Sequence, residues 1–238
     1  IETSMAKVYC SEQNSKVIDS GLQMMGGYGF IEEYNMARLY RDCRIDRIWE
    51  GTNEINRQII TGYIMKKSLM EELPVQQAIR DIDKFMSNGE LKDDNGTLLP
   101  ESNVVETAKR LALFLLDEGL CKFGQDLKHQ QQVADILANI FMDIYVAEST
   151  ILRAKKMLTN PNTHHSVEDI AKIFVAEMSQ RMIPDAEKAL KAIYNGSLDP
   201  VSLEKLNSFR NRMYLQTNTI GLKTKVADYA YTKNGYSY

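Results

Sequence analysis

The chain has 238 residues, which is enough for one large domain or two small ones and for a buried hydrophobic core. Apolar residues make up 44% and charged residues 26% of the sequence, a balance that is typical of globular proteins and excludes a largely disordered chain. The formal net charge of -3 provides no electrostatic attraction to nucleic acid or to an acidic membrane, so nucleic acid is not expected as a partner and membrane contact has no support.

Cysteine and histidine placement argues against a disulfide framework or a metal site. Cys10, Cys43 and Cys121 lie far apart without a CxxC pair, so free thiols in a reducing compartment are expected. His164 and His165 are adjacent, but no cysteine or acidic cluster completes a ligand set, and we predict no metal.

The beginning of the chain resembles an internal piece of a longer protein. It starts at Ile1, without Met, and is already in a helical pattern; no basic start followed by an apolar stretch indicates a signal peptide. No apolar run approaches the roughly 20 residues that a bilayer crossing needs. We expect an unsecreted protein, located in a bacterial cytoplasm or a mitochondrial matrix.

The first third of the sequence predicts three helices. Apolar residues from Met5 to Met25 recur at helical spacing, and this helix is expected to end at the glycines that follow. A short helix is expected over 35–42 and a longer one over 53–68.

The middle of the sequence predicts one short and two long helices. After Pro74 we expect a helix to Met86, then a loop over 87–100 that is rich in Asn, Asp and Gly. Two amphipathic helices are predicted next, around 104–116 and 133–152.

The last third contains recognisable helix start signals. Ser166 and Asp169 have the spacing of a capping box, and Pro184 predicts a break or a new helix start. Asp199 and Pro200 form an N-cap and first-turn pair, which opens a last helix to about Tyr214. A loose tail is expected over 232–238. No segment alternates with period two, so the fold class is predicted to be all-α, an antiparallel helical bundle.

The stretch 23–57 has an unusual combination of residues. It reads QMMGGYGFIEEYNMARLYRDCRIDRIWEGTNEINR, with clustered glycines, arginines at three-residue intervals, and Glu50 between Trp49 and Gly51. Singly, these features are typical of a helix end, a solvated helix face and a first-turn acid.

In this order and spacing they closely resemble the C-terminal signature of the acyl-CoA dehydrogenase family. The resemblance covers residues 1 to about 66 and rests on four segments, which are Gln23, Gly26-Gly27-Tyr28-Gly29, Arg41-Asp42-Cys43-Arg44-Ile45 and Glu50-Gly51-Thr52-Asn53.

The resemblance implies a role for each of these positions. Glu50 corresponds to the catalytic base that removes a proton next to the thioester carbonyl, and such a base must be close and desolvated; Trp49 is expected to exclude water from it. Gly51 would let the acyl-CoA lie against the backbone. Thr52, Asn53 and Glu54 correspond to residues that contact FAD, at a helix N-terminus suited to its pyrophosphate.

A second set of cofactor contacts is implied at the glycine turn. Gln23, Met24, Met25, Gly26 and Gly27 correspond to a stretch that meets the adenosine end of FAD, and in this family that contact comes from a neighbouring subunit. A homodimer is therefore expected.

The same resemblance divides the chain into residues 1–70, the end of the catalytic helical domain, and 71–238, an additional helical domain as in the very-long-chain group. The N-terminal and middle domains of the family are not in this sequence, so the piece alone is expected to be inactive. Acyl-CoA is the implied substrate of the complete enzyme, and an electron-transferring flavoprotein is its implied electron acceptor. Two alternatives stay open: an acyl-CoA oxidase, and a non-catalytic helical module for dimerisation or membrane contact.

Overall fold

The structure, a computed structural model, describes residues 1–88 and 96–233 of the chain. In these two ranges all regular elements are helices and none is a strand, which confirms the all-α prediction. The elements are α1 Glu2–Met25, α2 Gly27–Phe30, α3 Asn35–Ile45, α4 Asn53–Leu69, α5 Val75–Arg80, α6 Ile82–Asn88, α7 Leu99–Phe123, the 3₁₀ helix η1 Gly124–His129, α8 Gln131–Leu158, α9 Ser166–Ile193, α10 Pro200–Arg212 and α11 Thr219–Lys233.

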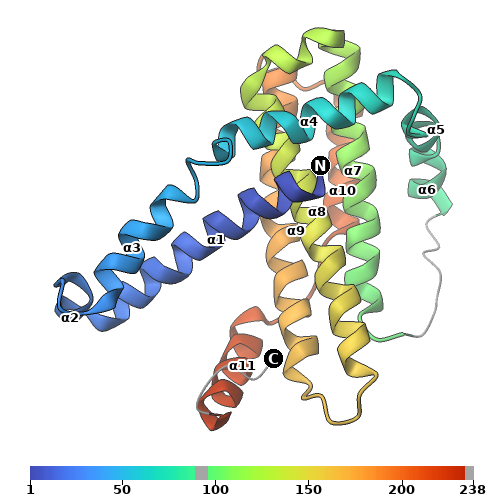
Figure 1. The fold of residues 1–238 in the computed structure, drawn as a ribbon. Helices are drawn as coiled ribbons and strands as arrows, with labels where there is room; N and C mark the ends of the chain where they lie inside the picture. The colour runs from blue at the N-terminus through green and yellow to red at the C-terminus, as the bar shows by residue number, and fades with distance from the viewer. Residues whose placement is uncertain (89–95, 234–238) are drawn as a thin grey trace.

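The C-terminal part forms an antiparallel bundle (Figure 1). Helices α7, α8 and α9 run side by side, and α10 packs against α7 and α9. Their apolar faces form one continuous core, in which Leu111, Leu115, Leu137, Met178 and Leu190 are almost fully buried. This burial stabilises the helices, because an amphipathic helix that is isolated in water is only marginally stable.

The N-terminal part forms an arm that projects from the bundle (Figure 1). Helix α1 leads outward, α2 makes the turn at the far end, and α3 returns along α1. The inner ends of α1 and α4 pack across α8. A small apolar cluster holds this crossing together, consisting of Met5, Val8, Ile60, Ala138 and Met142. This crossing at the base of the arm fixes it to the bundle. The domain limit expected at residues 70 and 71 stays a prediction.

Two predictions about α9 were wrong. Pro184 lies inside the helix and does not break it. The buried face continues past it through Ala186 and Leu190, so packing outweighs the lost backbone hydrogen bond. The capping box is also absent, because the N-cap is His165 and the Ser166 hydroxyl pairs with Nδ1 of His164 at 2.8 Å.

The predicted start of α10 is confirmed. Asp199 is its N-cap, and its carboxylate accepts hydrogen bonds from the backbone N–H groups of Val201 and Ser202 at 2.9 and 3.0 Å. By contrast, the helix predicted to follow Pro74 is divided at Asp81 into α5 and α6. The loop prediction over 87–100 falls largely on residues 89–95, outside the described residues, and α7 already begins at Leu99.

Helix α11 was not predicted. None of its residues is buried, so it lacks the apolar stripe on which sequence reasoning depends. Polar and ring contacts hold it against α9 and the turn before α9: Lys223 pairs with Glu177 of α9, and Tyr229 stacks on His164 of that turn with ring centroids 3.6 Å apart. Residues 234–238 of the predicted loose tail lie outside the described residues, and residues 232–233 form the end of α11.

Across the described ranges, no helix combines the length and apolar character that would let it span a membrane.

Candidate functional site

The turn that carries Glu50 joins α3 to α4 and has an unusual backbone. Glu50 has φ 54° and Gly51 has φ 79°, so two successive residues lie in the left-handed region. Glycine adopts this conformation readily, whereas for glutamate it costs on the order of 1–2 kcal/mol. Such strain persists only where surrounding contacts impose it, and it is concentrated at functional sites.

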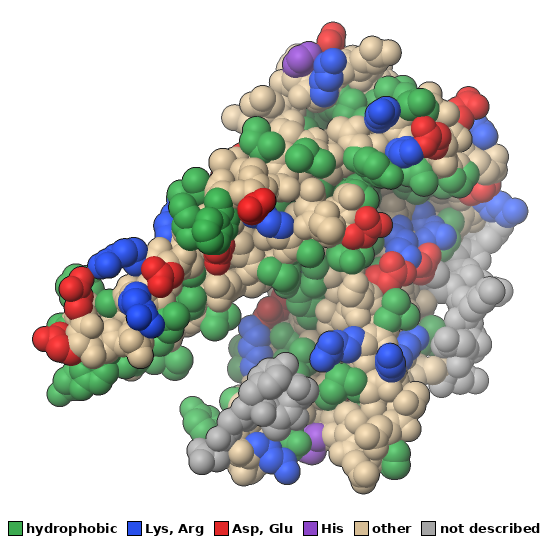
Figure 2. Space-filling view, viewed as in Figure 1, with side chains coloured by type: hydrophobic (Ala, Val, Ile, Leu, Met, Phe, Trp, Pro, Cys, Tyr) green, Lys and Arg blue, Asp and Glu red, His purple; other side chains and the backbone are tan. Residues whose placement is uncertain are grey.

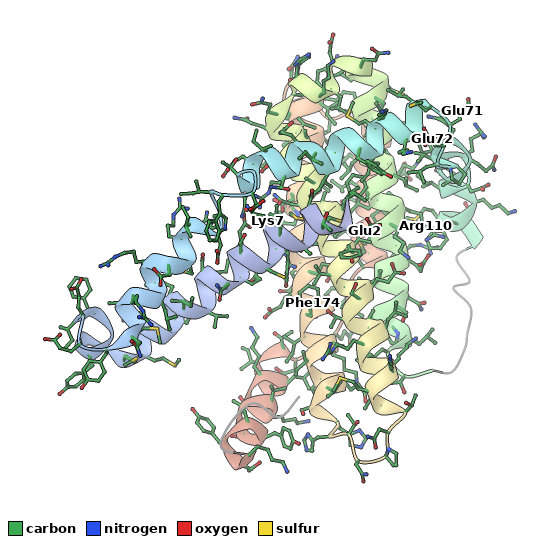
Figure 3. The ribbon with its side chains drawn as sticks, viewed as in Figure 1. Glu2, Lys7, Glu71, Glu72, Arg110 and Phe174 are labelled. Carbon is green, nitrogen blue, oxygen red and sulfur yellow. The ribbon has the colours of Figure 1, made fainter. Side chains whose placement is uncertain are left out.

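Two side chains hold the backbone of this turn. The Asn56 amide donates to the carbonyl of Gly51 at 2.7 Å and to that of Thr52 at 3.1 Å. From α1, the Lys7 ammonium donates to the same Gly51 carbonyl at 2.8 Å; Figure 3 labels Lys7 on the inner part of α1. Helix α4 then starts regularly, because the Thr52 hydroxyl caps it by accepting from the N–H of Ile55 at 3.3 Å.

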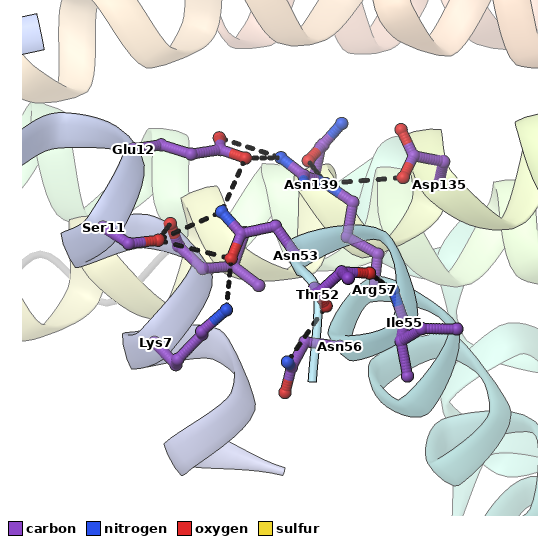
Figure 4. A network of polar contacts seen from close by, with 11 residues as sticks. Lys7, Ser11, Glu12, Thr52, Asn53, Ile55, Asn56, Arg57, Asp135 and Asn139 are labelled. Carbon is purple, nitrogen blue, oxygen red and sulfur yellow. Dashed lines mark hydrogen bonds and ion pairs between the residues drawn. The ribbon is translucent and has the colours of Figure 1, made fainter. Parts of the chain in front are cut away.

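A buried polar network extends from the turn into the arm (Figure 4). Asn53, which is 1% exposed, accepts from Lys7 at 2.7 Å and donates to the hydroxyl of Ser11 at 3.0 Å and to Glu12 at 3.1 Å. Glu12 in turn pairs with Arg57 at 2.8 Å. The Asn53 side chain thus faces inward and is satisfied by protein groups, so the cofactor contact expected of it is not supported by its position.

The network ends on the bundle. Nε of Arg57 donates to Oδ1 of Asn139 at 2.7 Å and lies 3.4 Å from the carboxylate of Asp135, both on α8. Burial raises the pKa of Asp135 above its ordinary value, and the Arg57 charge opposes this shift. An unbroken series of hydrogen bonds and ion pairs therefore connects the Glu50 turn with α8 of the bundle.

Glu50 itself is exposed to solvent in the described part of the chain. Trp49 beside it is 55% exposed, and the neighbouring Ile48 and Ile55 are 48% and 54% exposed. Figure 2 shows hydrophobic side chains on the surface of the arm. Water exclusion around Glu50, which we expected from Trp49, is not achieved by these residues alone.

The first turn of α4 carries an acidic side chain, and the pyrophosphate contact expected at this helix N-terminus stays a prediction. Glu54 stands in its first turn, where its own backbone N–H and the Thr52 hydroxyl lower the pKa of the Glu54 carboxyl. A carboxylate that already uses the positive end of the helix repels a second anion. The apolar groups next to Thr52 instead offer a surface on which an aromatic ring system can lie.

The second set of predicted cofactor residues lies at the far end of α1. Gln23, Met24, Met25, Gly26 and Gly27 are all exposed there. Gln23 is 16 positions after Lys7 on the same helix, which places this set about 24 Å along α1 from the Glu50 turn. The two predicted sets are therefore not brought together within one chain.

The glycines in this turn have structural reasons. Gly26 has φ 57° and ends α1. A Cβ on Gly29 would lie 2.6 Å from the carbonyl oxygen of Leu22, so only glycine lets α2 pack this closely on α1.

The arginines stand on α3 and the turn after it, and Arg41 pairs with Glu32 at 3.0 Å. A cleft of about 740 Å³ is lined by Asp19, Leu22, Phe30, Glu32, Ala37, Tyr40, Arg41 and Arg44.

Sequence reasoning did not identify Lys7 or Asn56. Asn56 lies within the recognised stretch, and its spacing of five from Gly51 lets a side chain in the first turn of α4 reach back to the preceding loop. For Lys7, which is 44 residues from Gly51, the sequence contains no signal.

Comparisons with known proteins agree with the resemblance noted in the sequence. Residues 1–65 and residues 107–207 each match a family model described as acyl-CoA dehydrogenase, C-terminal domain. A probable acyl-CoA dehydrogenase from Bacillus subtilis is 35% identical over 199 residues, which cover 82% of this chain and 34% of that protein. The chain thus spans about a third of the length of this relative.

Two further relatives extend the comparison. The caffeyl-CoA reductase-Etf complex subunit CarC of Acetobacterium woodii is 46% identical over 66 residues, 28% of this chain and 17% of that protein. A crystal structure of an acyl-CoA dehydrogenase complexed with FAD from Bacillus anthracis superimposes with a TM-score of 0.89 at 29% identity, over 99% of this chain and 40% of the other.

Proposed function

The chain belongs to the acyl-CoA dehydrogenase family, and from this premise we propose that it supplies the catalytic base, Glu50, to a flavin-dependent enzyme that desaturates acyl-CoA thioesters between Cα and Cβ. The observation that carries the proposal is the backbone at Glu50, a non-glycine residue at φ 54° that is held by hydrogen bonds to the next two carbonyls. Glu50 lies before the N-cap Thr52, so it is not a first-turn acid of α4.

The reaction needs a base and a hydride acceptor. The Glu50 carboxylate takes the proton from Cα, and the electron pair of that C–H bond forms the new double bond to Cβ. FAD, when bound, accepts the hydride that leaves Cβ. Gly51 has no side chain, so the thioester can lie against the backbone beside Glu50.

The residues of this chain that are expected to contact FAD form two groups, one for each end of the cofactor. We assign Thr52 and Glu54 to the ring end, because the α4 N-terminus is already used by Glu54 and adjoins exposed apolar groups. Residues 23–27 lie about 24 Å away along α1, which supports contact with the adenosine end of FAD in a second copy of the protein. A homodimer follows from this division.

We further infer that the chain acts only together with the rest of its protein. The Bacillus subtilis relative has about two thirds of its length outside the matched part. Trp49 and Ile48 are exposed here, although a working base must be shielded from water. The segment alone is therefore expected to be inactive and colourless. A bacterial cytoplasm or a mitochondrial matrix suits such an enzyme, since its relatives include bacterial and mitochondrial dehydrogenases.

The electron acceptor is proposed to be an electron-transferring flavoprotein. A relative of the first domain is named as a subunit of a complex with such a protein. Residues 71–238 are proposed as an additional helical domain that braces the catalytic helices through α8.

The test uses the full-length flavoprotein with Glu50→Gln, which keeps the size of the side chain and removes the base. Flavin content is measured first, and flavin bleaching by a series of saturated acyl-CoAs is then followed in a stopped-flow instrument. We expect unchanged flavin content and bleaching that is slower by about 100-fold or more. Glu33→Gln, an exposed carboxylate in the turn before α3, serves as the matched control and should bleach normally.

Normal bleaching of Glu50→Gln would refute the assignment and place the base elsewhere. If the reduced native enzyme is reoxidised rapidly by oxygen, it is an acyl-CoA oxidase. If the full-length protein binds no flavin, the chain is part of a non-catalytic helical module.

A further inference from the structure

The carbonyl of Gly51 is the point at which the Glu50 turn is attached to the rest of the protein. It accepts hydrogen bonds from the Asn56 amide at 2.7 Å and from the Lys7 ammonium at 2.8 Å. One donor comes from α4 and the other from α1, so the turn is held between two helices that are distant in the sequence.

The positions of both donors are themselves fixed. Asn56 is 6% exposed, and a Cβ on Gly51 would lie 3.2 Å from its amide nitrogen, so the two residues are in tight contact. Lys7 also donates to the Asn53 side chain at 2.7 Å, which orients its ammonium toward the turn. Asn53 is buried and bonded to Ser11 and Glu12 of α1.

The direction of the Glu50 side chain depends on this attachment. The carboxylate is exposed and makes no hydrogen bond within the described residues, so the left-handed backbone of Glu50 and Gly51 sets the position and direction in which the side chain leaves the chain. If the Gly51 carbonyl were released, Glu50 could relax to an ordinary φ, and the carboxylate would point elsewhere.

We propose that Lys7 and Asn56 are positioning residues, which hold the carbonyl of Gly51 and thereby aim the carboxylate of Glu50 at the Cα proton of the substrate. The proposal rests on the proposed function of Glu50 as the base. Neither residue touches the reacting atoms: Lys7 acts on the turn through the carbonyl of Gly51, and Asn56 acts through the carbonyls of Gly51 and Thr52.

The main variant is Lys7→Met in the full-length flavoprotein. Lys7 is half-buried on α1, and Met keeps most of its length while removing the ammonium donor. We expect bound flavin and the dissociation constant for acyl-CoA to stay unchanged, and the rate constant for flavin reduction to fall by about 10- to 100-fold, as for a misplaced catalytic group. Lys7→Arg, which restores a cationic donor, should recover part of this loss.

A second variant is Asn56→Asp, which replaces the donating amide by a carboxylate that repels the same carbonyl groups. A loss of similar size is expected. Lys16→Met is the matched control, because Lys16 is exposed on α1 and no contact of its side chain with the turn is recorded; its reduction rate should equal that of the native enzyme.

The decisive measurement combines Lys7→Met with Glu50→Gln. If Lys7 acts only by aiming Glu50, the double variant reduces its flavin no more slowly than Glu50→Gln alone, since groups that act as a unit are not additive. A further 10-fold loss in the double variant would overturn the proposal and show a separate role for Lys7.

The outcomes also separate this proposal from the assignment of Glu50. If Glu50→Gln is slow while Lys7→Met and Asn56→Asp reduce their flavin at the native rate, the base is right and the positioning role is wrong. If Glu50→Gln itself is unaffected, the assignment of the base fails, whatever the Lys7 variant does.

Discussion

Arg57→Met is expected to destabilise the protein because it removes the cation that joins the arm to the bundle. The side chain of Arg57 is 11% exposed, and it pairs with Glu12 at 2.8 Å, bonds to Asn139 at 2.7 Å and lies 3.4 Å from Asp135. Removing one partner of a fully buried pair costs about 3–5 kcal/mol.

For Arg57 this cost is lower, because its acidic partners are partly exposed to water, which screens their charges. The Glu12 side chain is 25% exposed and that of Asp135 is 43% exposed, so Asp135 adds little. We therefore expect a loss of about 2–3 kcal/mol of unfolding free energy, which corresponds to a Tm lower by about 4–12 °C in a chain of this size.

Urea unfolding followed by circular dichroism measures this loss. Arg153→Met is the matched control, because Arg153 is exposed on the same helix, α8, and should change stability by about 0.5 kcal/mol or less. Adding Glu12→Gln to Arg57→Met should recover stability, since the unpaired carboxylate is then removed. A loss for Arg57→Met no larger than that of the control would refute the idea that this network joins the arm to the bundle.

Three further predictions concern the bundle. Pro184→Ala should stabilise α9 by about 1–3 kcal/mol and raise the Tm, because it restores an N–H for the carbonyl of Gln180 within a continuous helix; an unchanged Tm would contradict this. Phe209→Ala should cost about 3–5 kcal/mol in urea unfolding, since Phe209 is 0% exposed and stacks on Phe114 at 5.9 Å, and a loss below about 1 kcal/mol would show that the core refills. Burial raises the pKa of Asp185 above its ordinary value of 3.8. Between the ordinary pKa and the raised one, the folded state therefore binds a proton that the unfolded state has lost, and the unfolding free energy falls as the pH rises through this range. Asp185→Asn should therefore stabilise the protein at pH 7 and lose this advantage below about pH 3, and melting curves at both pH values check the sign.

Much of the fold could be predicted from the sequence. Amphipathic spacing located α7 and α8, because a helix that packs on one side repeats its apolar residues at three and four. Asp199 predicted the start of α10 correctly, since an N-cap is made within one turn of the chain. The stretch around Glu50 likewise indicated the family from the residues in their order alone.

Other features of the chain were decided by its tertiary structure. Pro184 stays within α9 because the buried face on both sides of it is packed against the bundle, and α11 forms on contacts such as that of Tyr229 with His164 rather than on an apolar stripe. The contact between Lys7 and Gly51 joins residues 44 positions apart, and that between Arg57 and Asn139 joins residues 82 positions apart. Local patterns encode which segments are helical, because the hydrogen bonds of a helix are local; which side chain reaches the turn at Glu50 depends on how α1, α4 and α8 cross, and only the packed structure determines that.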